Sequence, residues 1–196
     1  MILKINGETV DVTLENEKTV GDFLKSFEEE AASNDATTTS IVLDGKTVPA
    51  DQIDSVLDQP LSDSTKMELT TVSQSAVIEE LKRCSGEFDQ LKATLKEVSV
   101  LLQSGKDSEA SAVISNLAET VGNFVIAARY ATLFPSLYEK ILIDGKDIGT
   151  FFEEFTDILK DFETAMQDKD TVTVGDLSEY EISPRLTMIS EAVGQL

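Results

Sequence analysis

Apolar and polar residues alternate along the first part of the chain with the two-residue period of a β-strand. Residues 2–5 and 9–14 alternate in this way on either side of Asn6-Gly7. An Asn-Gly pair between two alternating runs predicts a tight hairpin, because both residues accept the positive φ angles of its turn. Over residues 20–27 the period becomes that of an amphipathic helix, which Thr19 is placed to cap. The chain is therefore predicted to begin with a hairpin and a helix.

Two further apolar runs indicate strands after this helix. Residues 41–43 form a short run that ends at Asp44-Gly45, a second turn pair, and residues 67–72 form a longer alternating run. The predicted order is hairpin, helix, strand, irregular segment and strand, and we expect a domain at residues 1–72.

From residue 73 onward the apolar residues recur at alternating steps of four and three, which is the pattern of helices that pack along one seam. This pattern predicts three helices with apolar seams over residues 77–102, 110–131 and 148–166. Residues 134–143 are interpreted as a break and a short helix, and a last helix is expected to break at Ser183-Pro184. We therefore expect an α+β protein, with an antiparallel bundle of about four main helices at residues 73–196.

Three segments of the first domain resemble the ubiquitin-like β-grasp family, which includes the bacterial sulfur carriers of thiamine and molybdopterin synthesis. They are the helix start at residues 19–24, the strand and turn at 41–49, and Leu61-Ser62-Asp63. The resemblance implies a β-grasp fold. In carrier members the last strand leads to a free Gly-Gly, whereas here Ser73-Gln74-Ser75 and a helix follow. That departure argues against carrier chemistry and makes a sulfur-carrier relative fused to a regulatory bundle the weakest of our interpretations.

Charge narrows the possible partners. The chain has 37 acidic and 16 basic residues and a formal net charge of −21. Such a field repels phosphate groups, so we expect neither nucleic acid nor a membrane as a partner. A single cysteine fits a reducing compartment, and the first residues lack the pattern of a secretory signal, so we expect a cytoplasmic, bacterial protein.

The residues that several catalytic mechanisms require are missing from the chain. The chain has no histidine, which excludes Ser-His-Asp and Cys-His catalysis, and it has none of the usual glycine-rich phosphate loops. Cys84 falls on the apolar seam between Leu81 and Phe88, which predicts a buried structural thiol. We predict no catalytic residues, no cofactor and no enzymatic activity.

An acidic segment comes close to a calcium-binding loop. The acceptors that match an EF-hand at its positions 1, 3, 9 and 12 are Asp168, Asp170, Asp176 and Glu179. The fifth position is Val172, however, and the required glycine is displaced to Gly175. Because an acceptor and the turn are missing, we predict an acidic helix connection and no metal site.

A stripe of carboxylates offers a candidate surface for a partner. Glu153, Asp157 and Asp161 recur every four residues, and Phe151 lies one position off the apolar seam. We predict that these four residues bind another protein through a basic or mixed basic-apolar segment. The protein would then be a non-enzymatic adaptor, assembly factor or export-type chaperone. The alternative is a small-molecule or divalent-metal-binding domain that uses carboxylates of the helical part. The sequence leaves the oligomeric state open.

Overall fold

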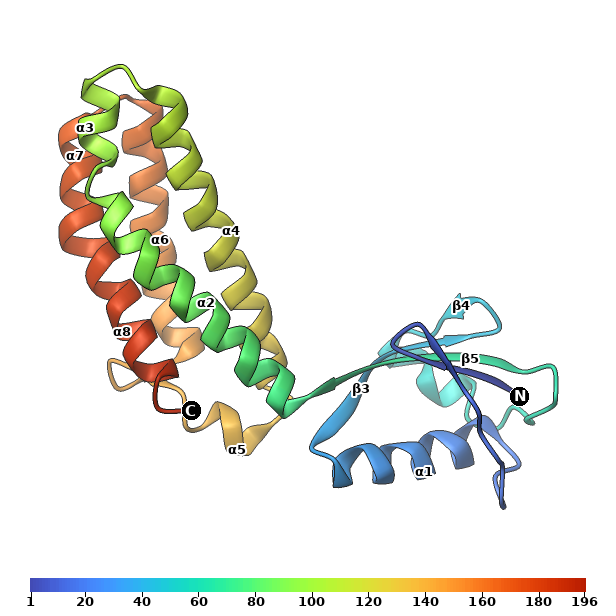
Figure 1. Ribbon diagram of the computed structural model, residues 1–196. Helices are drawn as coiled ribbons and strands as arrows, with labels where there is room; N and C mark the ends of the chain where they lie inside the picture. The colour runs from blue at the N-terminus through green and yellow to red at the C-terminus, as the bar shows by residue number, and fades with distance from the viewer. The chain divides into compact units, whose positions relative to one another are not determined.

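The structure is a computed structural model that describes residues 1–196. It divides into two compact units, residues 1–76 and 77–196 (Figure 1). With 61% of the residues in helices and 16% in strands, the chain has the predicted α+β class.

The N-terminal unit is built on a mixed five-stranded sheet of order β2-β1-β5-β3-β4. Its strands are β1 (Ile2–Ile5), β2 (Glu8–Val10), β3 (Ala36–Leu43), β4 (Lys46–Thr47) and β5 (Lys66–Ser73). The central pair β1 and β5 is parallel, and the other neighbours are antiparallel. Helix α1 (Val20–Ser33) crosses one face of the sheet, and a 3₁₀ helix (Ala50–Ser55) lies before β5 (Figure 1).

Alternation along the strands places the core of this unit between the sheet and α1. Leu3, Met67 and Leu69 point from β1 and β5 toward Val20 and Phe23 of the helix, and all five are buried. Residues of the opposite parity point away from α1, which leaves the other sheet face to solvent.

The start of α1 has the capping arrangement that the sequence predicts. Thr19 Oγ1 accepts a hydrogen bond from the Asp22 backbone N–H (3.1 Å), and Asp22 Oδ2 accepts one from the Thr19 N–H (3.0 Å). Hydrogen bonds from the backbone of Lys18 and Thr19 lower the pKa of the Asp22 carboxyl.

Three tight turns use the same chemistry. Asn6-Gly7, Asp44-Gly45 and Asp144-Gly145 all have positive φ angles at both residues. The first two form the hairpin and the strand turn that the sequence predicts. The third corrects the expected short helix over residues 134–143. That helix, α5, covers only Pro135–Tyr138, and a small hairpin of β6 (Leu142–Ile143) and β7 (Lys146–Asp147) follows.

The second unit is mostly helical. Its helices are α2 (Gln74–Leu95), α3 (Val98–Gln103), α4 (Asp107–Ala131), α5, α6 (Ile148–Gln167), α7 (Thr171–Asp176) and α8 (Ser183–Val193). Within this unit α2, α4, α6 and the α7–α8 segment run side by side (Figure 1). Aromatic rings fill the space between three of them. The Phe124 ring of α4 lies 5.7 Å from that of Phe88 in α2 and 5.5 Å from that of Phe152 in α6.

Two helix boundaries differ in detail from the prediction. The helix expected over residues 77–102 ends at Leu95, and a two-residue turn separates it from α3. The expected boundary at Ser183-Pro184 is present, because α8 begins at Ser183 with Pro184 in its first turn, but the helical backbone is not interrupted there, since a π-helical stretch (Leu177–Ile182) connects α7 directly to α8. In a regular α-helix the Pro184 ring would clash with the carbonyl four residues before it, and the wider π turn relieves this. Ser183 Oγ also donates to the Ser178 carbonyl at 2.7 Å, which satisfies one backbone acceptor.

Candidate functional site

An open groove of about 730 Å³ lies between α4 and α6 in the helical unit. Its walls come from the middle of α4 and the C-terminal half of α6. The α4 wall consists of apolar or small residues: Ile114, Leu117, Ala118, Val121 and Gly122. Leu117 is buried in the floor, whereas Ala118 and Gly122 are exposed.

The opposite wall comes from the last three turns of α6. It is formed by Leu159, Phe162, Glu163, Met166 and Gln167. Phe162 is buried in the floor, while Leu159 and Met166 are only half-buried. The sequence assigned Leu159 and Met166 to the apolar seam. They remain partly open because no element covers the space between α4 and α6, so the groove is an incompletely covered part of the core.

The groove is lined by acidic but not by basic charge. Glu163 is the only charged side chain that lines it, and no basic side chain does. Three acidic residues lie on α4 and five on α6, against one basic residue on each helix. The basic residue of α6, Lys160, is already paired with Asp157 at 3.0 Å. A ligand in the groove therefore meets an apolar floor in a negative field.

Helix α4 carries some apolar residues that are not buried within the unit. By length and composition alone it could cross a membrane, a test that core helices also pass. Buried residues make up 28% of its apolar 18-residue stretch, and the remainder includes polar side chains as well as half-buried apolar ones. Ile126 and Tyr130, further along the helix, are 55% and 40% exposed. The apolar surface thus extends beyond the groove itself.

Gly122 is a glycine that the fold itself does not need. It lies in the middle of α4, and a Cβ atom added to it would meet nothing within 4 Å. A glycine inside a helix costs about 0.5–1 kcal/mol of stability relative to alanine. Gly86 in α2 is equally unobstructed and exposed, but it lies away from the groove.

The predicted partner-binding residues do not form one surface. Phe151 was expected as an exposed anchor, and this is wrong, because the side chain is 4% exposed and packs 6.0 Å from Phe155, ring to ring. Glu153, Asp157 and Asp161 are exposed as expected. None of them lines the groove. At 100° per residue, Asp157 and Asp161 lie on the side of α6 away from Leu159.

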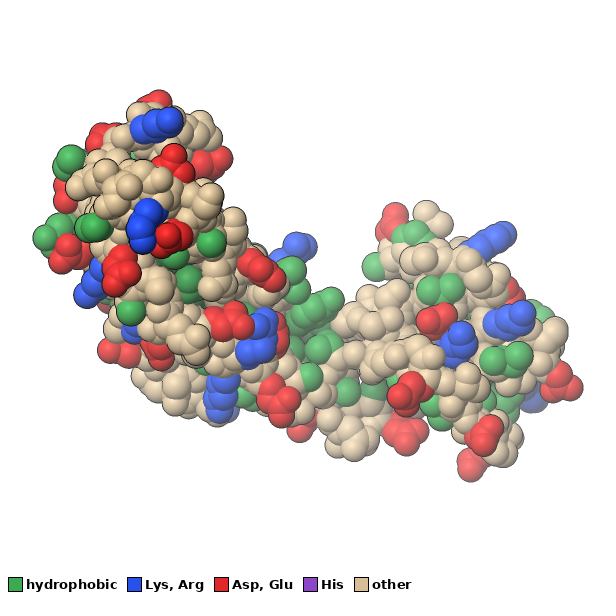
Figure 2. Space-filling model, turned by 45° about the horizontal axis from the view of Figure 1, so that its top comes forward, with side chains coloured by type: hydrophobic (Ala, Val, Ile, Leu, Met, Phe, Trp, Pro, Cys, Tyr) green, Lys and Arg blue, Asp and Glu red, His purple; other side chains and the backbone are tan.

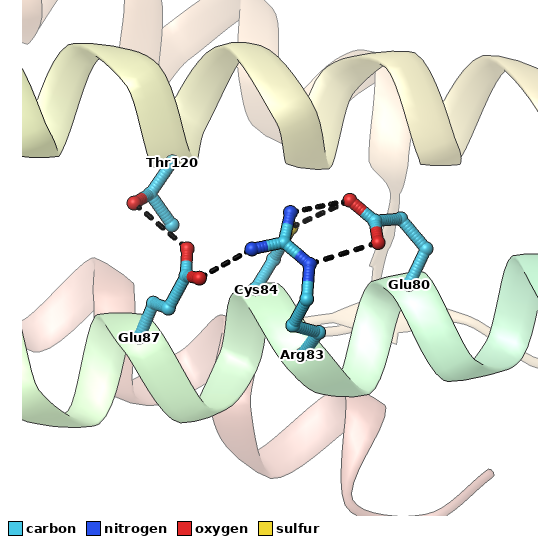
Figure 3. Close-up of polar contacts among 5 residues, drawn as sticks. All are labelled: Glu80, Arg83, Cys84, Glu87 and Thr120. Carbon is cyan, nitrogen blue, oxygen red and sulfur yellow. Dashed lines mark hydrogen bonds and ion pairs between the residues drawn. The ribbon is translucent and has the colours of Figure 1, made fainter.

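A polar cluster connects α2 to α4 (Figure 3). Arg83 binds Glu80 through two hydrogen bonds, from Nε at 2.9 Å and Nη2 at 2.5 Å, and it also pairs with Glu87. Thr120 of α4 is buried, and its hydroxyl donates to Glu87 Oε2 at 3.1 Å. The hydrogen bond of the Arg83 side chain is the main cause of a lowered pKa at Glu80. The charged groups satisfy one another, so the cluster positions the groove helix α4 and offers no free base or nucleophile.

Cys84 lies beside this cluster and is fully buried, as predicted for a structural thiol. Burial, with a smaller contribution from the Glu80 carboxylate, raises the pKa of the thiol to about 11. A thiol with so high a pKa carries almost no thiolate at neutral pH, so it is a poor nucleophile.

The acidic segment after α6 uses its carboxylates for the ends of helices. Asp168 ends α6, and Asp170 caps α7 by accepting hydrogen bonds from the Thr173 N–H (3.1 Å) and hydroxyl (2.7 Å). Asp176 and Glu179 are exposed on the helix that follows. No group of three or more acidic, cysteine or histidine side chains converges closely enough to hold a metal ion.

A smaller hollow of about 340 Å³ lies on the outward face of the sheet in the N-terminal unit. Its lining includes the apolar Ile2 and Val42, the basic Lys4 and Lys66, and the acidic Glu68. Basic side chains thus outnumber acidic ones in this hollow, unlike in the groove.

The sequence contains one signal for the groove. Ala118 and Gly122 are small residues four apart, next to Ile114 and Val121 on the predicted apolar seam. A seam widened on one side by small residues indicates an apolar face broader than one partner helix covers. The missing part was the spacing of α4 and α6, which depends on how the whole unit packs.

Comparisons with known proteins find a matching family model for each unit. A family model described as the TP0873 N-terminal domain matches residues 1–73. An uncharacterized protein of Treponema pallidum (strain Nichols), a bacterium, is 28% identical over 193 residues, which cover 98% of this chain and 96% of that protein. No solved structure matches the chain. A second family model, described as a domain of unknown function (DUF8042), matches residues 79–192, more than half of the chain. The protein therefore belongs to the DUF8042 family.

Proposed function

We propose that the protein is a non-enzymatic interaction module, an adaptor, assembly factor or export-type chaperone, that binds a basic or mixed basic-apolar segment of another protein. The observation that carries this proposal is the groove between α4 and α6. Its floor is apolar, its one charged lining residue is Glu163, and no basic residue lines it. A segment with apolar anchors and flanking lysine or arginine residues complements both properties.

The charge of the whole molecule supports the same class of partner. Acidic side chains are spread over the visible faces of both units and outnumber basic ones (Figure 2). Such a field accelerates the association of basic partners and slows that of acidic ones. We propose a cytoplasmic location on the evidence of the single, buried Cys84.

For the N-terminal unit we propose a ubiquitin-like β-grasp fold without carrier chemistry. The strand order β2-β1-β5-β3-β4, the parallel central pair and one helix across the sheet support this proposal. Strand β5 ends at Ser73 and α2 begins at the next residue, so no free Gly-Gly follows the sheet.

A pull-down with the full chain tests the proposed function. The native protein and a Glu163→Lys variant are each immobilised and exposed to an extract of cells that express the protein, at about 50 and 300 mM salt. We expect a partner with a lysine- or arginine-rich apolar segment, less of it at high salt because exposed charges are screened within ~8–10 Å, and less on Glu163→Lys.

A double variant, Glu153→Lys with Asp157→Lys, serves as the control for charge alone, since it changes acids outside the groove. Equal recovery on all three proteins at both salt concentrations would contradict the proposal. If only the double variant lost the partner, the acidic stripe would be the contact. A partner retained by every helical variant but lost on Lys4→Glu would place the binding surface on the sheet.

A further inference from the structure

We infer that the groove between α4 and α6 receives an amphipathic α-helix of a protein partner, whose backbone passes close to α4 at Gly122 and whose solvent-facing side is basic. This inference rests on the proposed function and specifies the conformation and the position of the bound segment.

The walls of the groove favour a helix over an extended peptide. Both walls are regular helices, whose backbone N–H and C=O groups are already paired within the helix, so no strand edge is available for β-augmentation. The lining residues on α4, from Ile114 to Gly122, span about 12 Å at ~1.5 Å per residue, which matches two turns of a third helix packed against two others.

Gly122 locates the closest approach. The glycine weakens α4, and no neighbour in the unit requires the absence of its side chain. Together with Ala118, one turn before it, it lowers the wall at the point where an incoming helix would cross. Small residues at such positions let two helix backbones approach closely. A side chain at residue 122 would occupy the space of the partner.

The charge of the groove decides between the possible occupants. Glu163 stands on the rim, and no basic side chain lines the groove. A second copy of this chain, with its net charge of −21, would be repelled, and so would an anionic membrane surface. A helix with lysine or arginine on its outer side is attracted by the same field.

Selection from a displayed library of random 16-residue peptides against the full chain tests the inference. We expect the selected peptides to carry apolar residues at steps of three and four with lysine or arginine between them. Inserting a proline at the centre of a selected peptide should weaken binding roughly tenfold or more, because proline interrupts a helix.

Two matched glycine variants test where on α4 the bound helix passes. Gly122→Leu should weaken binding of the selected peptides roughly tenfold or more, whereas Gly86→Leu should leave it unchanged. Both substitutions replace an exposed mid-helix glycine by a better helix former. Circular dichroism should show helix retained in both, so that a loss of binding is not a loss of fold. Glu163→Gln should weaken binding about two- to fivefold, the usual effect of one exposed ion pair.

The outcomes separate this inference from the function on which it rests. Basic-apolar peptides that bind Gly122→Leu as well as the native chain, or that tolerate the proline, would overturn the inference and leave the proposed function standing. Failure to select any basic-apolar peptide would overturn both. If light scattering showed a dimer that Gly122→Leu converts to a monomer, the occupant would be a second copy. If the native chain bound zwitterionic phosphatidylcholine vesicles and Gly122→Leu did not, the occupant would be a membrane. Either result overturns the inference.

Discussion

Replacing Thr120 by valine tests whether the polar cluster fixes α4, the helix that forms one wall of the groove. The two side chains have nearly the same shape, and Thr120 is 1% exposed, so the substitution removes one hydroxyl with little change in packing. The lost hydrogen bond ends on a carboxylate, a type worth about 1.5–3 kcal/mol. Glu87 is 35% exposed and keeps Arg83, so water and the guanidinium compensate in part. We therefore expect a loss of about 1 kcal/mol, below that range and typical of a hydrogen bond between neutral groups.

Thermal unfolding followed by far-ultraviolet circular dichroism measures this loss, because most of the helical signal comes from the second unit. For a chain of this size about 1 kcal/mol corresponds to a lowering of Tm by about 2–4 °C. Thr156→Val is the control, since the Thr156 hydroxyl is exposed and bonds only to the Phe152 carbonyl of its own helix. It should change stability by less than about 0.5 kcal/mol.

A double-mutant cycle with Glu87→Ala isolates the bond between the two helices. If Thr120→Val and Glu87→Ala are additive, the hydroxyl and the carboxylate do not interact, and the proposed link between α2 and α4 is wrong. The same conclusion follows if Thr120→Val is as stable as the native chain.

Three further predictions follow from individual sites. The Cys84 thiol, with a pKa of about 11, should not react with a maleimide or disulfide reagent at pH 8 in the folded protein. It should react once the chain is unfolded in guanidinium. Fast reaction of the folded chain would show that α2 is not packed as described. The Asp147 carboxylate caps α6, and the backbone hydrogen bond from Thr150 is the largest cause of its lowered pKa, so its stabilising effect is present above pH 3.8 and is lost as the pH falls through the lower folded value. Asp147→Asn, which still caps the helix but does not titrate, should therefore show a smaller drop in Tm between pH 5 and pH 2 than the native chain, and parallel curves would refute the assignment. Millimolar calcium should leave Tm unchanged, because the Asp170 carboxylate is already engaged in capping α7; a rise of several degrees that disappears in Asp168→Ala would mean that the acidic segment binds the ion.

The local features that the sequence predicted are those determined by neighbouring residues. The Asn6-Gly7 hairpin, the capping pair at the start of α1 and the buried position of Cys84 each depend on a few residues and on side-chain period, and all three are present. The backbone before Pro184 was not predicted. A break was expected there, but the stretch before α8 adopts a π turn with Ser183 bonded to Ser178, and the spacing of apolar residues does not distinguish the two.

For the candidate site, too, the sequence predicted the character of individual residues but not how the helices pack. Heptad spacing identified Leu159 and Met166 as apolar seam residues, but spacing alone does not reveal that their side of α6 stays partly uncovered. It also placed Phe151 outside the seam, because a strict repeat of four and three admits one residue per turn. In the structure Ile148, Phe151 and Phe155 are all buried, so the core-facing side of α6 is wider than the repeat. The acidic stripe could be predicted from the sequence, because a row of carboxylates along a helix is expected to be exposed whichever helices pack beside it. The groove was not, because it is formed by the distance between two helices.

The negative charge and the open groove are best explained together. An uncovered apolar groove invites self-association, since two copies could bury their grooves against each other. A net charge of −21 opposes that contact and still permits the approach of a basic segment. Solubility alone would account for the charge but not for Gly122, which weakens α4 without any steric need inside the unit. A role only in the core would account for the buried apolar residues of α4 but not for the exposure of Ile126 and Tyr130. A basic helix bound in the groove would account for the charge, the glycine and the exposed apolar surface with one contact.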